Sequence, residues 1–270
     1  ATHGRAFWIL DDVAPLRELA PGTAAEPVHF FRPQTALRWR ASLNTDTPLP
    51  PEEPVGENPP DGAILDFWLK APAREVRLEI LDAAGQVLRR FDGQDAPEPV
   101  DPTTLNVPAF WIRPPQALPA SAGVHRFVWD LRLAPPPTFR QEPTMAAEPE
   151  DTPLEPQGAL VPPGSYRVRL TVDGKAAEQP LTVRMDPRVT TSSADLARQY
   201  ALGRALAGAM GRSFQAAASA PPDRARKLQK LNGQMGSLLV LTQQADAAPT
   251  PAQVRASERL EAELRSLLAP

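Results

Sequence analysis

Cysteine is absent from this chain of 270 residues, which excludes disulfides, thiol nucleophiles and thiolate metal sites and leaves the redox compartment open. No apolar run approaches the roughly 20 residues that a membrane-spanning helix needs. The net charge is -3, and the basic residues are scattered among acidic ones, so no basic patch for a phosphate backbone is visible. We therefore expect neither a membrane span nor a nucleic-acid partner.

Histidine is scarce, and the chain carries no common motif for catalysis or nucleotide binding. His3, His29 and His125 stand in different segments, without the HxH or HExxH spacing of a metal site. We expect His125 to be a partly buried histidine that bonds to the backbone. Glycine-rich phosphate loops and a GxSxG nucleophile motif are also absent. The sequence therefore predicts no catalytic residue, no cofactor and no bound metal.

Acidic residues form three visible groups, which are Asp11-Asp12, Glu52-Glu53 and Glu148-Glu150-Asp151. Glycoside hydrolysis needs two acids held roughly 5 to 10 Å apart across a cleft. The second and third groups lie in proline-rich segments, where nothing holds a rigid geometry, so we interpret them as solvated charges. Asp11 and Asp12 follow an apolar run, and we expect them to cap a turn.

Proline is abundant, with 34 residues against 15 glycines. This is far above the ordinary proline content of roughly 5% and excludes continuous helix or central strand where prolines cluster. Residues 21–60 are predicted to form a proline-rich linker, with residues 27–42 as a candidate edge strand. Residues 135–157 have the low hydrophobicity of a mobile loop.

Alternating apolar and polar residues predict half-buried strands between residues 61 and 190. The strongest signal is a hairpin over residues 162–189 that reverses at Asp173-Gly174, a dipeptide typical of tight hairpin turns. Residues 75–82 and 86–91 are predicted to pair around a turn at residues 82–85. The pattern places eight side chains in one β-sandwich core: Val76, Leu78, Ile80, Phe127, Trp129, Tyr166, Val168 and Leu170.

After Val189 the apolar period changes from two to about 3.6, which predicts three amphipathic helices over residues 191–270. Ser193 is the expected cap of the first helix. Thr250, with Pro251 and Gln253 after it, predicts a capping box at the start of the third. Each helix must bury one apolar stripe, either against the other two helices in an antiparallel bundle or against another domain or chain.

Five tryptophans remain as candidates for recognition. An exposed indole can stack on a sugar ring or on a partner chain, whereas a buried indole fills the core. Trp39, Trp68 and Trp111 form the possible binding surface that the sequence suggests.

Four stretches of the chain carry a family resemblance: THGRAFWILDDVAPLREL, NTDTPLPPEEPVGENPPDGAILDFWLK, GVHRFVWDLR and PPGSYRVRLTVDGKAAEQPLTVRMDPR. Together they resemble the C-terminal region of bacterial sortilin-like, BNR-repeat propeller proteins, which are often labelled glycosyl hydrolases. The matching blocks cover much of residues 2–190, and the helical tail fits more loosely. GSYRVRLTVDGK is also similar to the hairpin of FlgD-like immunoglobulin-type domains.

The resemblance implies a mainly β protein with an α-helical C-terminal tail. Residues 1–20 would be the last strand of a truncated β-propeller, residues 21–60 the linker, residues 61–190 an immunoglobulin-like β-sandwich with proline-rich insertions, and residues 191–270 the helical bundle. Thr2 to Asp12 would close a propeller whose earlier blades lie upstream.

The function implied is accessory and non-catalytic: the region braces its own upstream propeller and presents a protein- or glycan-binding surface. The location implied is periplasmic or extracellular, with a leader upstream of this fragment. The alternative is part of a glycosyl hydrolase with a sialidase-type propeller whose active site lies upstream, and an ordered acid pair facing a cleft would favour it. A carbohydrate-binding module with coplanar exposed aromatics is a third interpretation.

Overall fold

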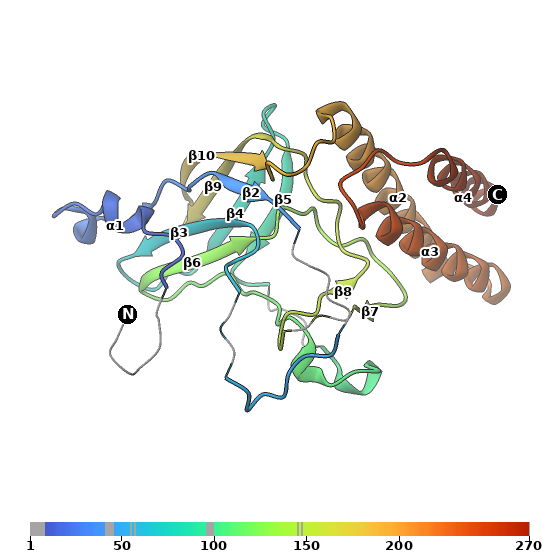
Figure 1. Cartoon of the computed structure of the whole chain (residues 1–270), viewed down its shortest axis with the longest axis horizontal. Helices are drawn as coiled ribbons and strands as arrows, with labels where there is room; N and C mark the ends of the chain where they lie inside the picture. The colour runs from blue at the N-terminus through green and yellow to red at the C-terminus, as the bar shows by residue number, and fades with distance from the viewer. Residues whose placement is uncertain are drawn as a thin grey trace.

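The computed structural model describes residues 9–40, 46–54, 56, 58–95, 100–144, 146 and 148–269. Within these residues, ten strands form three sheets, and three long helices follow toward the C-terminal end (Figure 1). The predicted order of strands first and helices last is therefore confirmed. Among the described residues, no helix combines the length and the apolar character that a membrane crossing requires.

The first sheet has three strands in the order β1-β3-β6. These strands are β1 (Val28–Phe30), β3 (Ala63–Leu69) and β6 (Gly123–Trp129), and both pairings are antiparallel. β1 comes from the predicted linker and covers one edge of β3, as expected for a short edge strand. On the other side of β3, β6 forms the second edge of the sheet.

The second sheet has five strands in the order β2-β10-β9-β4-β5. They are β2 (Ala36–Arg38), β10 (Lys175–Met185), β9 (Gly164–Val172), β4 (Val76–Leu81) and β5 (Val87–Asp92). The predicted hairpin is β9-β10, and Asp173 and Gly174 both have the positive φ that its tight turn requires. β4 and β5 pair around their turn as predicted.

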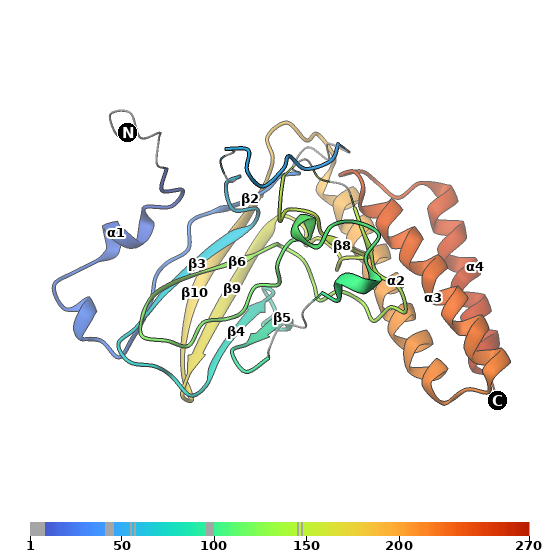
Figure 2. The same ribbon diagram turned by 90° about the horizontal axis from the view of Figure 1, so that it is seen from below.

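One apolar core lies between the two sheets. It takes side chains from β3 and β6 of the first sheet and from β2, β4, β9 and β10 of the second. All eight predicted core residues belong to it, and Trp129 is fully buried with its Nε1 donating to the carbonyl oxygen of Arg132 over 2.9 Å. Figure 2 shows β3 and β6 crossing the face of β9 and β10.

The proline-rich segments carry little regular structure. The third sheet is a pair of two-residue strands, β7 (Glu142–Pro143) and β8 (Leu154–Glu155), inside the proline-rich insertion over residues 135–157. The other proline-rich insertion, between β5 and β6, holds two short 3-10 turns, η2 (Pro102–Thr104) and η3 (Ala109–Trp111). A bridge between Ile112 and Thr152 joins the two insertions, so they support each other.

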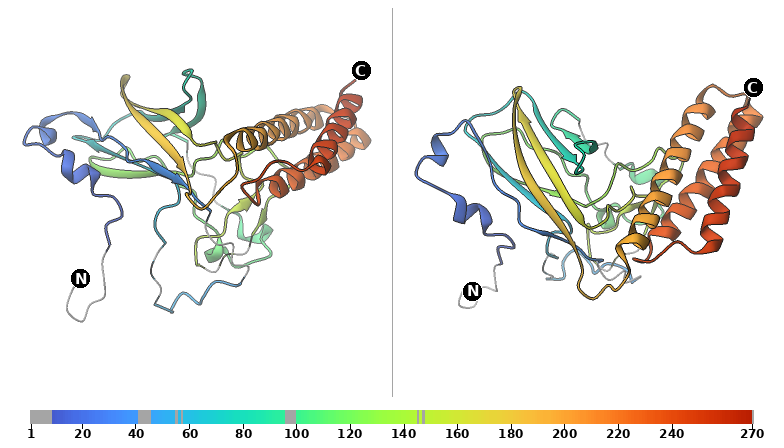
Figure 3. Two further views of the ribbon diagram at one scale, coloured as in Figure 1. Left: turned by 45° about the horizontal axis from the view of Figure 1, so that its top comes forward. Right: turned by 90° about the horizontal axis from the view of Figure 1, so that it is seen from above.

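Three helices end the chain: α2 (Ser193–Ser219), α3 (Pro222–Gln243) and α4 (Pro251–Leu268). They lie side by side at one end of the molecule (Figure 3) and share one apolar cluster. The capping box of Thr250 and Gln253 is confirmed. The cap of α2 is Ser192, one residue before the expected Ser193, because the Ser192 hydroxyl accepts the backbone N–H of Asp195.

The predicted propeller strand lies largely outside the described residues, which begin at Ile9. Residues 9–12 form no strand, and the short helix α1 (Ala14–Glu18) and the 3-10 turn η1 (Thr23–Ala25) follow them. The carboxylate of Asp12 accepts the backbone N–H of Ala14 over 2.7 Å, so it caps a turn as expected. α1 lies at the opposite end of the molecule from the three long helices (Figure 1).

A buried charge cluster joins the helices to the second sheet. Arg38 at the end of β2 is 1% exposed and contacts Asp246, whose side chain is 4% exposed, over 2.6 Å. Its guanidinium also donates to the Val161 carbonyl and to Gln199 on α2. Arg40 contacts the same carboxylate over 3.0 Å. We call Arg38, Arg40 and Asp246 the hub; only the two arginine Nε atoms in it lack an acceptor.

Candidate functional site

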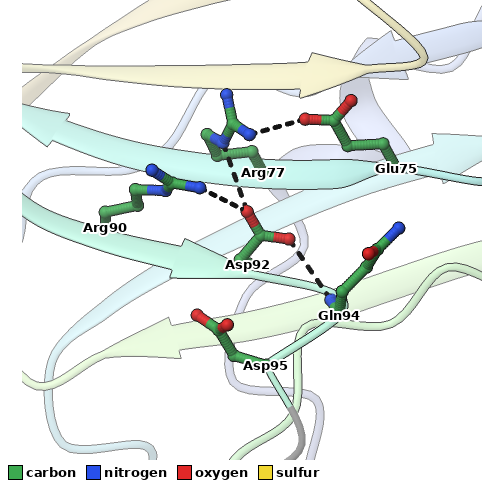
Figure 4. Close-up of a pocket in the computed structure, with 6 residues that line it drawn as sticks. All are labelled: Glu75, Arg77, Arg90, Asp92, Gln94 and Asp95. Atoms are coloured by element: carbon green, nitrogen blue, oxygen red, sulfur yellow. Dashed lines mark hydrogen bonds and ion pairs between the residues drawn. The ribbon is translucent and has the colours of Figure 1, made fainter.

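A shallow charged surface lies on the outer face of β4 and β5 (Figure 4). Asp92 is its centre, because it contacts Arg90 over 2.7 Å and Arg77 over 3.3 Å. Arg77 also contacts Glu75 over 2.6 Å. The hydrogen bond from Arg90 holds the pKa of Asp92 below its ordinary value. These groups satisfy one another, so this surface is a structural ion-pair network.

A much larger cleft, of about 1130 Å³, lies where the proline-rich insertions meet the edges of the two main sheets. Its walls hold six prolines, at positions 51, 59, 60, 114, 115 and 149, and its floor and sides hold four aromatic side chains. Six carboxylates and two guanidinium groups complete the lining: Glu53, Asp61, Asp130, Glu148, Glu150, Asp151, Arg89 and Arg113. We call this the acidic cleft.

The floor of the acidic cleft is made by β5 and β6, the edge strands of the two main sheets. Phe91 on β5 contacts Phe127 on β6 edge to face, with ring centroids 4.6 Å apart. Arg89 shares the inward face of β5 with Phe91, and its guanidinium lies 4.8 Å from the centre of that ring. Alternation along the strand sends Arg90 and Asp92 to the opposite face, into the ion-pair network.

Gly62 positions Asp61 at the cleft. It stands directly before β3 with a φ of 142°, a region that glycine alone adopts readily. A Cβ built on Gly62 would lie 2.1 Å from the carbonyl oxygen of Trp129, so the backbone of β6 approaches too closely for any side chain. The close approach places Asp61 and Asp130, which flank this contact, on the same part of the cleft surface.

Burial among the cleft walls raises the pKa of Asp61. The charges of Arg113 and Arg132 oppose this rise, and the smaller effects of Asp130 and Asp151 add to it. Burial also raises the pKa of Asp130, against the charge of Arg132 and the hydrogen bond from its backbone. The cleft is open, so both residues remain exposed to solvent even though its walls surround them. The ionised forms of these two acids are thus disfavoured in the free protein.

Most of the cleft carboxylates have no partner. Among the described residues, the side chains of Glu53, Asp61, Glu148 and Glu150 make no hydrogen bond or ion pair. Asp151 alone forms an ion pair, with Arg113 over 2.7 Å. Arg89 is a basic residue of the cleft that also lacks a partner among the described residues. Burial lowers its pKa, and its Nε is buried without an acceptor. The cleft therefore combines unpaired charges of both signs with an excess of acids.

The backbone around the cleft is strained. Three residues other than glycine have a positive φ in the described chain, and one of them, Asp173, belongs to the hairpin turn. The other two are Leu131, which directly follows Asp130, and Glu150, which lines the cleft. A left-handed conformation costs an L-residue about 1 to 2 kcal/mol. Such strain concentrates at functional sites, where the surrounding structure maintains it.

The structure separates the three tryptophans that the sequence suggested as a binding surface. Trp39 is half-buried and lines the acidic cleft. Trp111 is half-buried in η3, where its ring meets the cleft residue Phe110 at right angles. Trp68 lies at the far end of β3 from Asp61, with its Nε1 donating to the carbonyl oxygen of Glu26 over 3.3 Å. A binding role for these tryptophans stays a prediction.

The histidines do not enter the cleft. His125 bonds to the carbonyl oxygen of Ser121 over 2.6 Å, as predicted, and His29 contacts Glu26 and Glu18. His3 lies outside the described residues. Across the described part of the chain, no three or more histidine and acidic side chains are grouped to hold a metal ion.

Sequence reasoning missed the centre of the cleft. Asp61 and Asp130 were not singled out, since each stands alone in the sequence. The acids of residues 148–151, interpreted as solvated charges, lie with them in one concave surface. The signal that could have found Asp61 is the Asp-Gly pair directly before a buried strand. No protein-family description matches the chain, and no curated protein shows significant similarity to it.

Proposed function

We propose that this chain is a non-catalytic accessory region that binds a protein or glycan in the acidic cleft. One observation carries the proposal: the cleft is large, open and lined by charged side chains that lack partners. Glu148 and Arg89 are half-buried and have no hydrogen-bond or ion-pair partner among the described residues. Half-buried charges are normally paired, because an unpaired charge loses hydration without compensation. A ligand that supplies the missing partners recovers this free energy.

The resemblance to sortilin-like, BNR-repeat proteins supports a place for this region after a β-propeller of the same protein. On this proposal the region braces that propeller and acts in the periplasm or outside the cell. Residues 61–190 would be an immunoglobulin-like sandwich, which the shared core of the two sheets supports. Residues 191–270 would form a three-helix bundle, which the apolar cluster common to α2, α3 and α4 supports.

A role as part of a glycosyl hydrolase is the second candidate, because Asp61 and Asp130 are two acids that face one cleft. Their raised pKa values also suit a general acid. Against it, no hydrogen bond from a described residue holds the carboxylate of Asp61, and only the backbone N–H of Arg132 contacts that of Asp130. Catalytic carboxylates need locked positions, which this pair lacks.

The experiment that separates the two is an activity and binding assay on the purified chain. We expect no turnover of chromogenic glycosides, and we expect ligands from an array of glycans and charged peptides to be retained. Binding should weaken in the double variant Asp61→Asn/Asp130→Asn. Turnover that the same double variant abolishes would establish the hydrolase instead. An array without any cleft-dependent ligand would contradict the binding function.

A further inference from the structure

We propose that the acidic cleft accepts an extended peptide segment bearing lysine or arginine, which adds as a strand along the open edge of β5. This inference rests on the proposed binding function and names the class of partner. Three independent features of the cleft support it, which are its charge, the strand edge at its floor and its shape.

Charge complementarity favours a cationic ligand. Carboxylates outnumber guanidinium groups six to two on the cleft surface, and the one ion pair among them, between Arg113 and Asp151, leaves an excess of acids. The charge of Asp130 disfavours the ionised form of Asp61, because like charges repel. A basic side chain between them would relieve this repulsion and favour both ionised forms.

The edge of β5 provides the means to hold a peptide backbone. β5 is the last strand of its sheet, and no described residue pairs with its outer edge. Such an edge presents unpaired N–H and C=O groups, and an extended peptide satisfies them by strand addition. β5 is also the strand that carries Arg89 and Phe91 into the cleft, so the open edge and the cleft floor belong to one element.

Arg89 and the aromatic residues suit the same ligand. The buried Nε of Arg89 has no acceptor in the free protein, and a peptide carbonyl would supply one. Trp39, Phe91 and Phe110 offer apolar surface for the aliphatic stems of lysine or arginine. The charged ends of those side chains would then lie against the carboxylates.

The shape of the cleft favours a chain over a compact molecule. Its volume of about 1130 Å³ lies above the roughly 300 to 1,000 Å³ of ordinary small-molecule pockets. The prolines of the walls offer no backbone N–H donors to a ligand. An extended peptide takes its hydrogen bonds from β5 instead and needs none from the walls.

The test measures the fluorescence anisotropy of a labelled peptide that alternates lysine and serine, mixed with the whole chain. A glutamate–serine peptide is the charge control, and a chitosan oligosaccharide is the glycan control. The protein variants are Asp61→Asn/Asp130→Asn and the matched control Glu258→Gln/Glu263→Gln, which removes the same charge from the exposed surface of α4. A further peptide carries an N-methyl group on every residue, so neither of its edges has a backbone donor for strand addition.

We expect the lysine peptide to bind, with affinity about tenfold weaker for the cleft variant and unchanged for the α4 variant. N-methylation should abolish binding, because it removes the backbone donors that face β5. Equal binding of the methylated peptide would overturn strand addition. Cleft-dependent binding of chitosan or of the glutamate peptide, without the lysine peptide, would overturn this inference and leave the binding function intact. No cleft-dependent binding of any probe would overturn both.

Discussion

The charged groups of the hub are paired with one another, whereas most of the carboxylates in the acidic cleft have no partner among the described residues. In the hub, Asp246 contacts two guanidinium groups, and Arg38 also bonds to a carbonyl and to Gln199. The side chains of Arg38 and Asp246 are buried. In the cleft, Asp61 and Arg89 lack hydrogen-bond and ion-pair partners among the described residues, although solvent reaches both. The same residue types therefore serve two purposes, and the state of pairing distinguishes them.

This difference shows which charges hold the fold and which remain available to a ligand. Burial alone would raise the pKa of Asp246, but the hydrogen bonds and charges of Arg40 and Arg38 outweigh it and hold that pKa below its ordinary value. At Asp61 the charges of Arg113 and Arg132 offset burial only in part, and its pKa is raised. We infer that the hub stabilises the docking of the helices on the sheet, whereas the cleft charges cost stability in the free protein.

The largest effect is expected from breaking the hub. Arg38→Met leaves Asp246 buried with only Arg40 beside it, and removing one member of a buried pair typically costs about 3 to 5 kcal/mol. Urea denaturation followed by circular dichroism measures the loss. Arg188→Met is the control, because Arg188 forms an ion pair with Asp186 while its own side chain is 78% exposed. Similar losses in both variants would contradict a special role for the hub.

The second prediction concerns Gly62, whose close contact with β6 brings the cleft acids together. Gly62→Ala puts a methyl group against the backbone of Trp129 and forces an unfavourable φ, which we expect to cost about 1 to 3 kcal/mol. Gly22→Ala is the matched control, since a Cβ there meets no atom within 4 Å. An unchanged unfolding midpoint for Gly62→Ala would show that β6 can move away from this contact.

A smaller effect tests the strain at the cleft rim. Glu150→Gly should raise the free energy of unfolding by about 1 kcal/mol, because glycine adopts the φ of 58° without a steric penalty. Glu150→Gln removes the same charge and keeps the strain. If both variants shift the unfolding midpoint equally, then the gain comes from charge and not from the backbone.

The two clusters also predict opposite responses to pH. The folded-state pKa of Asp246 is lowered, so its contribution to stability is present above its unfolded pKa and is lost as the pH falls through its folded pKa. The folded-state pKa values of Asp61 and Asp130 are raised, so their cost is present at neutral pH and disappears as the pH falls through those raised values. At neutral pH, Asp246→Asn should therefore lower the free energy of unfolding relative to the wild type, and Asp61→Asn should raise it. Both differences should shrink as the pH falls through the acidic range. Differences of the same sign would contradict this assignment.

Local signals in the sequence predict local structure well here. Asp173-Gly174 determines a hairpin, and Thr250 with Gln253 determines a helix start, because each depends on atoms a few residues apart. The acidic cleft depends on a fold that brings Asp61, Asp130 and Glu150 to one surface, which no short motif encodes. Proline-rich composition predicts a mobile loop over residues 135–157, and no local signal there predicts the bridge between Ile112 and Thr152 or the β7-β8 pair.

The most direct test of the central claim, that the cleft acids serve a ligand and not the fold, is a paired measurement on Asp61→Asn/Asp130→Asn. Thermal unfolding at neutral pH gives the stability of the free protein, and anisotropy with the lysine peptide gives the affinity. The account predicts a midpoint equal to or above that of the wild type together with about tenfold weaker binding. A lower midpoint with unchanged binding would show that Asp61 and Asp130 are structural and would contradict the claim.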